Sequence, residues 1–252
     1  MTSLINIHKT KKYDQYIGRA GKGLDGYFGN PCRLEDFSGD RRSCLDAYER
    51  YFTQRLANDL EFRTRVDGLR GKTLGCFCWP EQCHGESIIA HLDDPNRVSV
   101  VAFTGHRPDK LGGYSRANPT RNGVLASLLG ALRAMRPHHA ITGMALGVDQ
   151  WAARCCIHLG IPFTAAIPFA GQERLWPKES QREYWNILGH ASSIQVVCGP
   201  GIDPVGALQT RNEWMVDRCD RVLAVHDGSK GGTYNCIHFA RLVGKRVDVI
   251  KP

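Results

Sequence analysis

Residues 98–110 read VSVVAFTGHRPDK and decide how the larger part of the chain folds. Val98 to Phe103 form a run of β-branched and aromatic residues, which is typical of a buried strand. Directly after this run, Gly105 allows close backbone approach and Arg107 supplies a planar fork suited to phosphate. A buried strand that runs into a small, polar loop is expected where a parallel sheet binds its ligand.

The same alternation of apolar strand and amphipathic helix continues to the end of the chain. The predicted strands are 98–103, 139–143, 161–169, 193–197, 221–227 and 246–250, and the predicted helices are 121–135, 148–159, 179–191, 207–218 and 233–243. Short apolar strands separated by amphipathic helices imply a mainly parallel sheet that is covered on both faces. We therefore predict a doubly wound α/β domain whose ligand lies beyond the carboxyl ends of the strands.

Turn-forming residues before the first of these strands mark a domain boundary. The sequence Asp-Asp-Pro-Asn at 93–96 ends one pattern before the next begins. We place the boundary at about residue 96, which gives one domain over 1–96 and a second over 97–252. The first domain is predicted to contain short strands over 13–18 and 73–78 and helices over 44–60 and 86–92. This pattern indicates a smaller α/β or α+β unit.

The positive charge of the chain belongs to its second domain. The formal net charge is +8; residues 1–97 carry 15 Lys and Arg against 14 Asp and Glu, and residues 98–252 carry 18 against 11. A phosphate-bearing ligand explains this excess as well as DNA would. No apolar run approaches the ~20 residues that cross a bilayer, and the first residues lack the apolar stretch of a signal peptide. We expect a cytoplasmic protein with no membrane partner.

Three glycine-bearing loops follow predicted strands and precede helices. A tight turn explains any one of them, but together they would gather amide groups and helix N-termini around one crevice. The loops therefore predict an anion site, in which a histidine is expected to bind rather than to catalyse. The ligand-binding residues predicted from these loops are Gly105, His106, Arg107, Gly143, Gly147, Gly231, Gly232 and Thr233.

Five motifs in the second domain carry a family resemblance. They are TGHRPDKLGGY at 104–114, GMALGVDQWAA at 143–153, PFAGQERLWP at 168–177, RNEWMVDRCD at 211–220 and GGTYNC at 231–236. In this order they resemble the YpsA-like branch of the SLOG superfamily, a Rossmann-like group that includes cytokinin-activating phosphoribohydrolases and DNA-processing protein A. The resemblance covers residues 98–252. It implies binding of nucleotides or nucleotide-derived molecules, with hydrolysis of an N-glycosidic bond in some members.

The resemblance also implies roles for individual residues. The catalytic branch pairs an Arg on the helix before the fifth strand with a Glu after the glycine-rich loop. Arg211 matches the family's Arg, so it is also predicted to bind the ligand. Asn235 occupies the position of the family's catalytic Glu. An amide cannot act as an acid or base, which weakens the hydrolase interpretation. Asp149 and Glu213 are the nearby carboxylates that could take the role of the missing Glu. In the alternative interpretation, Asp149 holds a ribose hydroxyl and Glu213 is a solvated helix residue.

The first domain contains the cluster CFCWPEQCH at 76–84. In a reducing compartment such a cluster is typical of metal-binding or reactive cysteines. Cys76, Cys78, Cys83 and His84 could supply four tetrahedral ligands for zinc, although Cys83 and His84 can both ligate only from a turn. Two alternatives stay open. One is a pocket in which Arg19, Asn30, Cys83 and His84 meet a small ligand, and the other is a packed structural cluster in which His84 caps the following helix.

Residues 13–92 resemble a small domain of unknown function from phage and bacterial genomes. The resemblance rests on IGR at 17–19, GNP at 29–31 and a CWCxPxxCHG-type segment, in which Phe77 replaces the usual tryptophan. It implies no particular reaction.

The leading hypothesis is a protein whose second domain binds a nucleotide or nucleotide-derived metabolite, with cleavage or transfer at its N-glycosidic bond as the accompanying reaction. The first alternative is a non-catalytic receptor or sponge for a nucleotide-derived signal. The second is a nucleic-acid-binding or DNA-processing protein, which is not favoured because the chain has no recognised DNA-reading motif. Zinc is the cofactor under consideration, and a homo-oligomer is expected.

Overall fold

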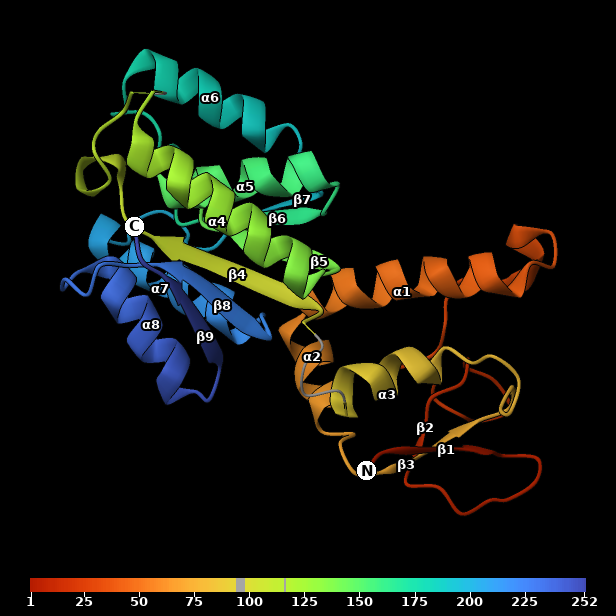
Figure 1. Cartoon of the computed structure of the whole chain (residues 1–252). Helices are drawn as coiled ribbons and strands as arrows, with labels where there is room; N and C mark the ends of the chain where they lie inside the picture. The colour runs from red at the N-terminus through yellow and green to blue at the C-terminus, as the bar shows by residue number, and fades with distance from the viewer. Residues whose placement is uncertain (94–97, 116) are drawn as a thin grey trace. The chain divides into compact units, whose positions relative to one another are not determined.

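A computed structural model of the chain describes residues 1–93, 98–115 and 117–252 (Figure 1). The chain divides into two compact units, Met1–Arg97 and Val98–Pro252. The domain boundary predicted at about residue 96 lies outside the described residues. Among the helices of the described part, none is long and apolar enough to cross a membrane.

A six-stranded parallel sheet forms the centre of the second unit. Its strands are β4 (Val100–Gly105), β5 (His139–Thr142), β6 (Phe163–Ile167), β7 (Ser193–Val196), β8 (Arg221–Val225) and β9 (Arg246–Ile250). Their order across the sheet is β7-β6-β5-β4-β8-β9. The chain moves outward from β4 to β7 and then returns to β8 on the other side of β4. The order therefore reverses between β4 and β8, and such a switch point is where open α/β sheets bind ligands.

Helices cover both faces of this sheet. They are α4 (Pro119–Met135), α5 (Val148–Leu159), α6 (Lys178–Leu188), α7 (Pro204–Asp217) and α8 (Gly232–Leu242). Figure 1 shows α4, α5 and α6 on one face and α7 and α8 on the other. On the first face, Val101 and Phe103 of β4 share a core cluster with Leu128 of α4 and Val148 of α5. The predicted doubly wound α/β architecture is confirmed.

Two of the helices begin earlier than their apolar patterns indicate. The side chain of Asn118 accepts a hydrogen bond from the backbone N–H of Thr120, and that of Asp203 accepts one from Val205. A proline follows each cap at the first helical position, where its missing N–H costs nothing. These caps place the starts of α4 and α7 before the predicted positions 121 and 207.

The first unit is a smaller α/β structure around a parallel sheet with the order β1-β3-β2. Its elements are β1 (Ser3–Asn6), β2 (Gln15–Tyr16), the 3₁₀ turn η1 (Leu34–Phe37), α1 (Arg41–Asn58), α2 (Leu60–Asp67), β3 (Thr73–Cys76) and α3 (Gly85–Asp93). Neither β1 nor α2 is predicted from the sequence. β1 is short and only partly buried, so it has no apolar run. Asp59 ends α1 and caps α2 by accepting the N–H of Phe62 at 2.9 Å, which divides the predicted helix 44–60.

An aromatic core holds the helices of the first unit together. The rings of Tyr48 and Phe52 stack with centroids 5.7 Å apart, and Phe52 meets Phe62 of α2 edge-on at 5.9 Å. Tyr48 also meets the ring of His84 edge-on at 5.0 Å. The core thereby fixes the histidine of the cysteine cluster from the side of α1.

Candidate functional site

A cleft of about 760 Å³ opens at the carboxyl ends of β4 and β8. Lys110, in the 3₁₀ turn η2 (Pro108–Lys110) after β4, donates a hydrogen bond to the hydroxyl of Ser229 in the loop after β8, with 2.7 Å between the atoms. The two loops therefore meet where the strand order reverses. The cleft brings together predicted residues from the end of β4 and the loop after it, the loop before α8, the first turns of α5 and α8, and α7. They are Gly105, His106, Arg107, Asp149, Arg211, Gly231, Gly232, Thr233 and Asn235.

Gly143 and Gly147 are not among the residues that line this cleft, and each makes room for a part of it. A Cβ atom on Gly143 would lie 1.5 Å from Nη1 of Arg211 and 2.7 Å from Oδ2 of Asp149. Gly147 has a φ of +92°, and a Cβ there would lie 2.6 Å from the carbonyl oxygen of His106. Both glycines allow these close approaches, and their contact with a ligand stays a prediction.

The floor of the cleft contains a buried ion pair. Nη1 of Arg211 lies 3.3 Å from Oδ2 of Asp149, and the two side chains are 6% and 7% exposed. Burial raises the pKa of Asp149 above its usual range, and the guanidinium of Arg211 opposes this rise. The backbone N–H of Ala145 donates to the same carboxylate oxygen at 3.3 Å. Nε of Arg211 is buried and has no hydrogen-bond partner among the described residues.

The two other polar residues that the resemblance singles out lie differently. Asn235, in the first turn of α8, lines the cleft. Glu213 does not line it, because residues two positions apart on a helix point to nearly opposite sides and Arg211 takes the inward side. Instead, Oε1 of Glu213 accepts a hydrogen bond from Nε2 of Gln209 at 2.8 Å. Of the two carboxylates predicted to replace the missing Glu, the structure brings Asp149 into the cleft.

The cleft receives the N-termini of two helices that differ in their capping. The side chain of Asp203 caps α7 by accepting the N–H groups of Val205 and Gly206. α8 begins after Gly231, which has no side chain to provide a cap. The first N–H groups of a helix have no partner within the helix. At α8 these groups belong to Gly232 and Thr233, both of which line the cleft.

His106 fixes the loop after β4 to the loop after β8. Its Nε2 lies 2.8 Å from Oδ1 of Asp227, and its ring is 5.2 Å from that of His226. Hydrogen bonds from Ser229, followed in effect by the contact with His106, hold the pKa of Asp227 well below its usual range. His106, His226 and Asp227 lie close enough to share a metal ion, but both ring nitrogens of His226 have hydrogen-bond partners. Its Nε2 lies 2.9 Å from the Ser229 carbonyl oxygen, and its Nδ1 accepts the N–H of Gly228.

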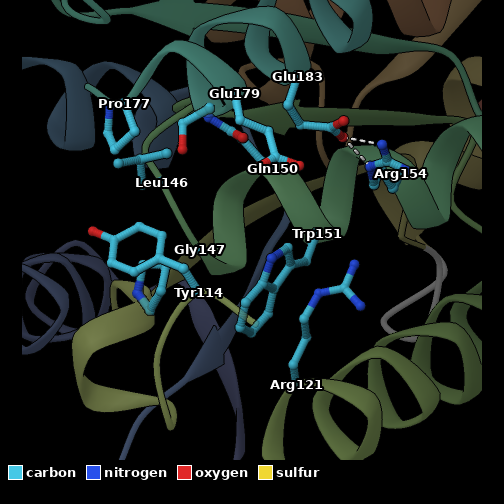
Figure 2. A pocket seen from close by; sticks show the side chains of 12 residues that line it. Tyr114, Arg121, Leu146, Gly147, Gln150, Trp151, Arg154, Pro177, Glu179 and Glu183 are labelled. Atoms are coloured by element: carbon cyan, nitrogen blue, oxygen red, sulfur yellow. Dashed lines mark hydrogen bonds and ion pairs between the residues drawn. The ribbon is translucent and has the colours of Figure 1, made fainter. Parts of the chain in front are cut away.

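A second, smaller cavity of about 260 Å³ lies beside η2, α5 and α6 (Figure 2). Tyr114 and Trp151 line it, together with an ion pair between Arg154 and Glu183. Of the predicted binding residues it contains Gly147 alone. We therefore place the candidate site in the larger cleft.

The residues predicted from the sequence do not include the N-terminus of α7, which also lines the cleft. Asp203, Val205 and Gly206 line the cleft, as do the cations of Lys110 and Lys230. The segment GPGIDP at 199–204 carries the signal that could have found this N-terminus, since a glycine turn is followed by an Asp-Pro helix start. The helix predicted from the apolar pattern begins at residue 207, after this segment.

In the first unit, the four residues of the cysteine cluster converge. Sγ of Cys78 lies 3.0 Å from Sγ of Cys76 and 3.1 Å from Sγ of Cys83, and Nδ1 of His84 lies 3.9 Å from Sγ of Cys83. Nε2 of His84 lies 2.8 Å from the carbonyl oxygen of Ile17. The alternative in which His84 caps α3 is therefore wrong, because its ring is directed to another segment.

Arg19 and Asn30 are bound to each other rather than to the cluster. Nε of Arg19 donates to the carbonyl of Asn30 at 2.8 Å, and Nη2 donates to the carbonyl of Cys32. Both residues thus shape the loop between β2 and η1. Within the described residues, no hydrogen bond joins either of them to Cys83 or His84, and the four-residue pocket stays a prediction.

Comparison with known families divides the chain in the same way. Residues 101–241 match the model of the YspA SLOG family, and residues 5–94 match a domain of unknown function, DUF4326. An uncharacterized SPbeta prophage-derived protein, YoqJ of Bacillus subtilis (strain 168), is 33% identical over 144 residues, which cover 49% of this chain and 84% of the relative. A UPF0398 protein of Bacillus thuringiensis (strain Al Hakam) is 27% identical over 145 residues, covering 54% of this chain and 78% of the relative.

Two solved structures of DNA processing protein A are also similar. The protein from Streptococcus pneumoniae has a TM-score of 0.46 and 21% identity over 62% of this chain, which spans about half (51%) of that structure's length. The protein from Helicobacter pylori, described by its single-stranded DNA binding mode, has a TM-score of 0.45 and 20% identity over 62% of this chain and 67% of its own.

Proposed function

Because the chain belongs to the YspA SLOG family through residues 101–241, we propose that its second unit binds a phosphorylated nucleoside in the cleft between β4 and β8. Membership supports the general class of a nucleotide or nucleic-acid ligand. The more specific proposal rests on the charges and hydrogen-bond donors that line the cleft.

The phosphate is proposed to bind at the start of α8. Free N–H groups and the positive end of the helix dipole favour an anion there, and Gly231 leaves the backbone accessible. Arg107, Lys110 and Lys230 line the same cleft. Asp203 already caps α7, so the N-terminus of α8 is the better position for an added negative charge.

Arg211 provides the observation that carries the proposal. Its side chain is buried, yet Nε has no hydrogen-bond partner in the part of the chain that the structure describes. A buried donor that stays unpaired costs about 1–3 kcal/mol, so an unpaired donor in a native protein calls for a partner such as a ligand, an ion or a water molecule. An acceptor on a bound ligand would satisfy Nε while Nη1 stays with Asp149.

The nucleoside is proposed to lie toward α7. Val205 and Leu208 give that side of the cleft an apolar surface, and Gln209 and Asn212 add amide groups that can pair with a base. Asp149, on the floor, is the candidate for holding a ribose hydroxyl. A nucleoside phosphate has both the anionic and the apolar parts that this cleft offers.

Calorimetry with a panel of nucleoside monophosphates, NAD and ADP-ribose tests the proposal. Losing a charged hydrogen bond costs about 1.5–3 kcal/mol, so Arg107→Ala should weaken the best ligand roughly 10- to 150-fold. Arg241→Ala is the matched control, since this exposed arginine lies in the last turn of α8, away from the cleft. If Arg107→Ala binds the best ligand as tightly as the wild type does, the phosphate does not bind beside Arg107. Preferential binding of single-stranded DNA over every nucleotide would favour the nucleic-acid alternative.

A second candidate function is cleavage or transfer at the N-glycosidic bond of the bound nucleotide. It is favoured by Asp149, a buried carboxyl with a raised pKa in the cleft, which is typical of catalytic acids. It is weakened by Asn235, because an amide cannot supply the missing carboxylate. Without turnover, tight binding of one nucleotide would identify the protein as a receptor or sponge for that nucleotide.

A further inference from the structure

We propose that Cys76, Cys78, Cys83 and His84 form a closed, tetrahedral zinc site that organises the first unit. All four donor atoms lie within 4.8 Å of one another, although they come from the end of β3, the following loop and the residues just before α3. Three thiolates and one imidazole are a ligand set of structural zinc sites. This site is independent of the cleft in the second unit.

The distances between the donors fit one small metal ion. Zinc–sulfur bonds of ~2.3 Å in a tetrahedron place the sulfur atoms ~3.8 Å apart. Sγ of Cys78 lies 3.0 Å from Sγ of Cys76 and 3.1 Å from Sγ of Cys83. Each sulfur atom must therefore move by only a few tenths of an ångström to reach the tetrahedral spacing. An iron–sulfur cluster would separate ligand sulfur atoms further, because several metal and sulfide ions lie between them. The geometry therefore favours a mononuclear site.

The loop that carries the cysteines is held by residues distant in sequence. Nδ2 of Asn6, at the end of β1, donates to the carbonyl oxygens of Phe77 and Trp79 on either side of Cys78. Asn6 is also paired in register with Cys76 across the sheet. The backbone path between the first two cysteines is thus set by β1. Because β1 already orders this loop, a metal ion would have less of the chain to order when it binds.

His84 is oriented as a metal ligand should be. Its Nε2 lies 2.8 Å from the carbonyl of Ile17, so Nε2 carries the proton and Nδ1 faces Sγ of Cys83 with its lone pair. Zinc-bound histidines usually donate their other N–H to a carbonyl or carboxylate in this way. Gly85 permits the arrangement, since a Cβ there would lie 2.6 Å from Cδ2 of Leu4 and 2.8 Å from Cδ1 of Ile17.

The last thiol of the cluster lies at the start of α3. Cys83 directly precedes the histidine at the N-terminus of α3, and the N–H of Gly85 donates to its sulfur at 3.4 Å. This contact holds the sulfur of Cys83 beside Nδ1 of His84. With four protein ligands the site has no position for a substrate, so its expected role is to join β1, β3 and α3 rather than to catalyse.

The test measures metal in the full chain, purified under reducing conditions without an affinity metal. We expect about one zinc per chain by mass spectrometry of the metal, and less than about a tenth of that in Cys78→Ser. Cys78 is chosen because it is partly exposed, so its replacement disturbs packing least. Cys32→Ser is the matched control, since Cys32 is also partly exposed but is absent from the cluster, and it should keep its zinc.

A cobalt titration keeps the proposal testable if Cys78→Ser does not fold. Adding Co²⁺ to chelator-treated wild-type protein should give the visible absorption of tetrahedral cobalt, a sulfur-to-cobalt charge-transfer band, and saturation at one equivalent. Zinc should displace this signal. Wild-type protein that neither contains zinc nor gives the cobalt spectrum would overturn the proposal, as would full zinc content in Cys78→Ser. A disulfide among the three cysteines in the intact mass of freshly reduced and purified protein would also overturn it.

Discussion

Replacing Arg211 with methionine should destabilise the second unit strongly, because it leaves Asp149 buried without its cation. The two side chains are 6% and 7% exposed and 3.3 Å apart. Removing one partner of such a buried pair costs 3–5 kcal/mol. Asp149 keeps the hydrogen bond from the N–H of Ala145, so we expect the lower value, about 3 kcal/mol. For a unit of this size, that corresponds to a fall of roughly 6–12 °C in melting temperature.

The pH dependence of this loss identifies its cause. In Arg211→Met, the guanidinium that chiefly opposes the effect of burial is gone, so burial raises the folded-state pKa of Asp149 further above its unfolded value of ~3.9. The folded state then binds the proton more tightly, so the variant loses stability as the pH rises from about 4 through this raised pKa. Acidification from pH 7 toward pH 5 should therefore shrink the difference in unfolding free energy between the variant and the wild type. Adding Asp149→Asn should abolish this pH dependence.

Urea unfolding followed by tryptophan fluorescence suits the measurement, since four of the five tryptophans lie in the second unit. Each variant is compared with wild-type protein at matched pH between 5 and 8. A cost below about 1 kcal/mol that does not change with pH would refute the reasoning, because it would show that Asp149 is either hydrated or neutral in the wild type.

Three further predictions test other parts of the second unit. Gly143→Ala should displace the Arg211 guanidinium, and calorimetry should show nucleotide binding weakened at least as much as in Arg107→Ala. Gly130→Ala in α4 is the control, because a Cβ there meets nothing within 4 Å. It should leave nucleotide affinity unchanged and stabilise the helix by about 0.5–1 kcal/mol. Equal affinities would contradict the close approach at Gly143. Burial lowers the pKa of His139 to about 4. The unfolding free energy of the wild type should therefore fall by about 3 kcal/mol as the pH falls from about 6.5 to 4. His139→Gln should make the unfolding free energy nearly independent of pH over this range. An unaltered acid limb would show that another group titrates. Wild-type protein should release free base from nucleoside monophosphates slowly or not at all by chromatography, and Asp149→Asn should abolish any release, with a loss of about 10²- to 10⁴-fold. Rapid release that survives Asp149→Asn would exclude Asp149 as the catalytic acid or base.

The architecture of the second unit follows from local sequence patterns. Runs such as 98–103 and 221–227 are long enough, and apolar enough, to identify buried strands, and the helices between them show their own periodicity. The alternation by itself requires parallel strands with helices on both faces. The same patterns place Gly105, Arg107 and Gly231 at the carboxyl ends of strands, and the structure gathers these loops at one cleft.

The first unit was less predictable because its elements are short and partly buried. β1 has four residues and no apolar run, so nothing local distinguishes it from a loop; it is a strand because β3 pairs with it. The division of the helix at Asp59 has a local cause, since an aspartate can end one helix and cap the next. Asp59 is therefore a local signal in the sequence for two helices where one is predicted.

By itself, the sequence determined the residue types of the site, the order of its loops and the cluster at 76–84. Only the tertiary structure decided which of those residues meet, because distances between loops depend on strand order and helix packing. Asp149 and Arg211 are 62 positions apart and touch because the start of α5 and the middle of α7 meet at the cleft. Gly143 is predicted as a ligand residue, and the structure adds that it leaves space for that pair. The same holds for His84, whose partner Ile17 is 67 positions away and was placed beside it by the packing of β2, β3 and α3.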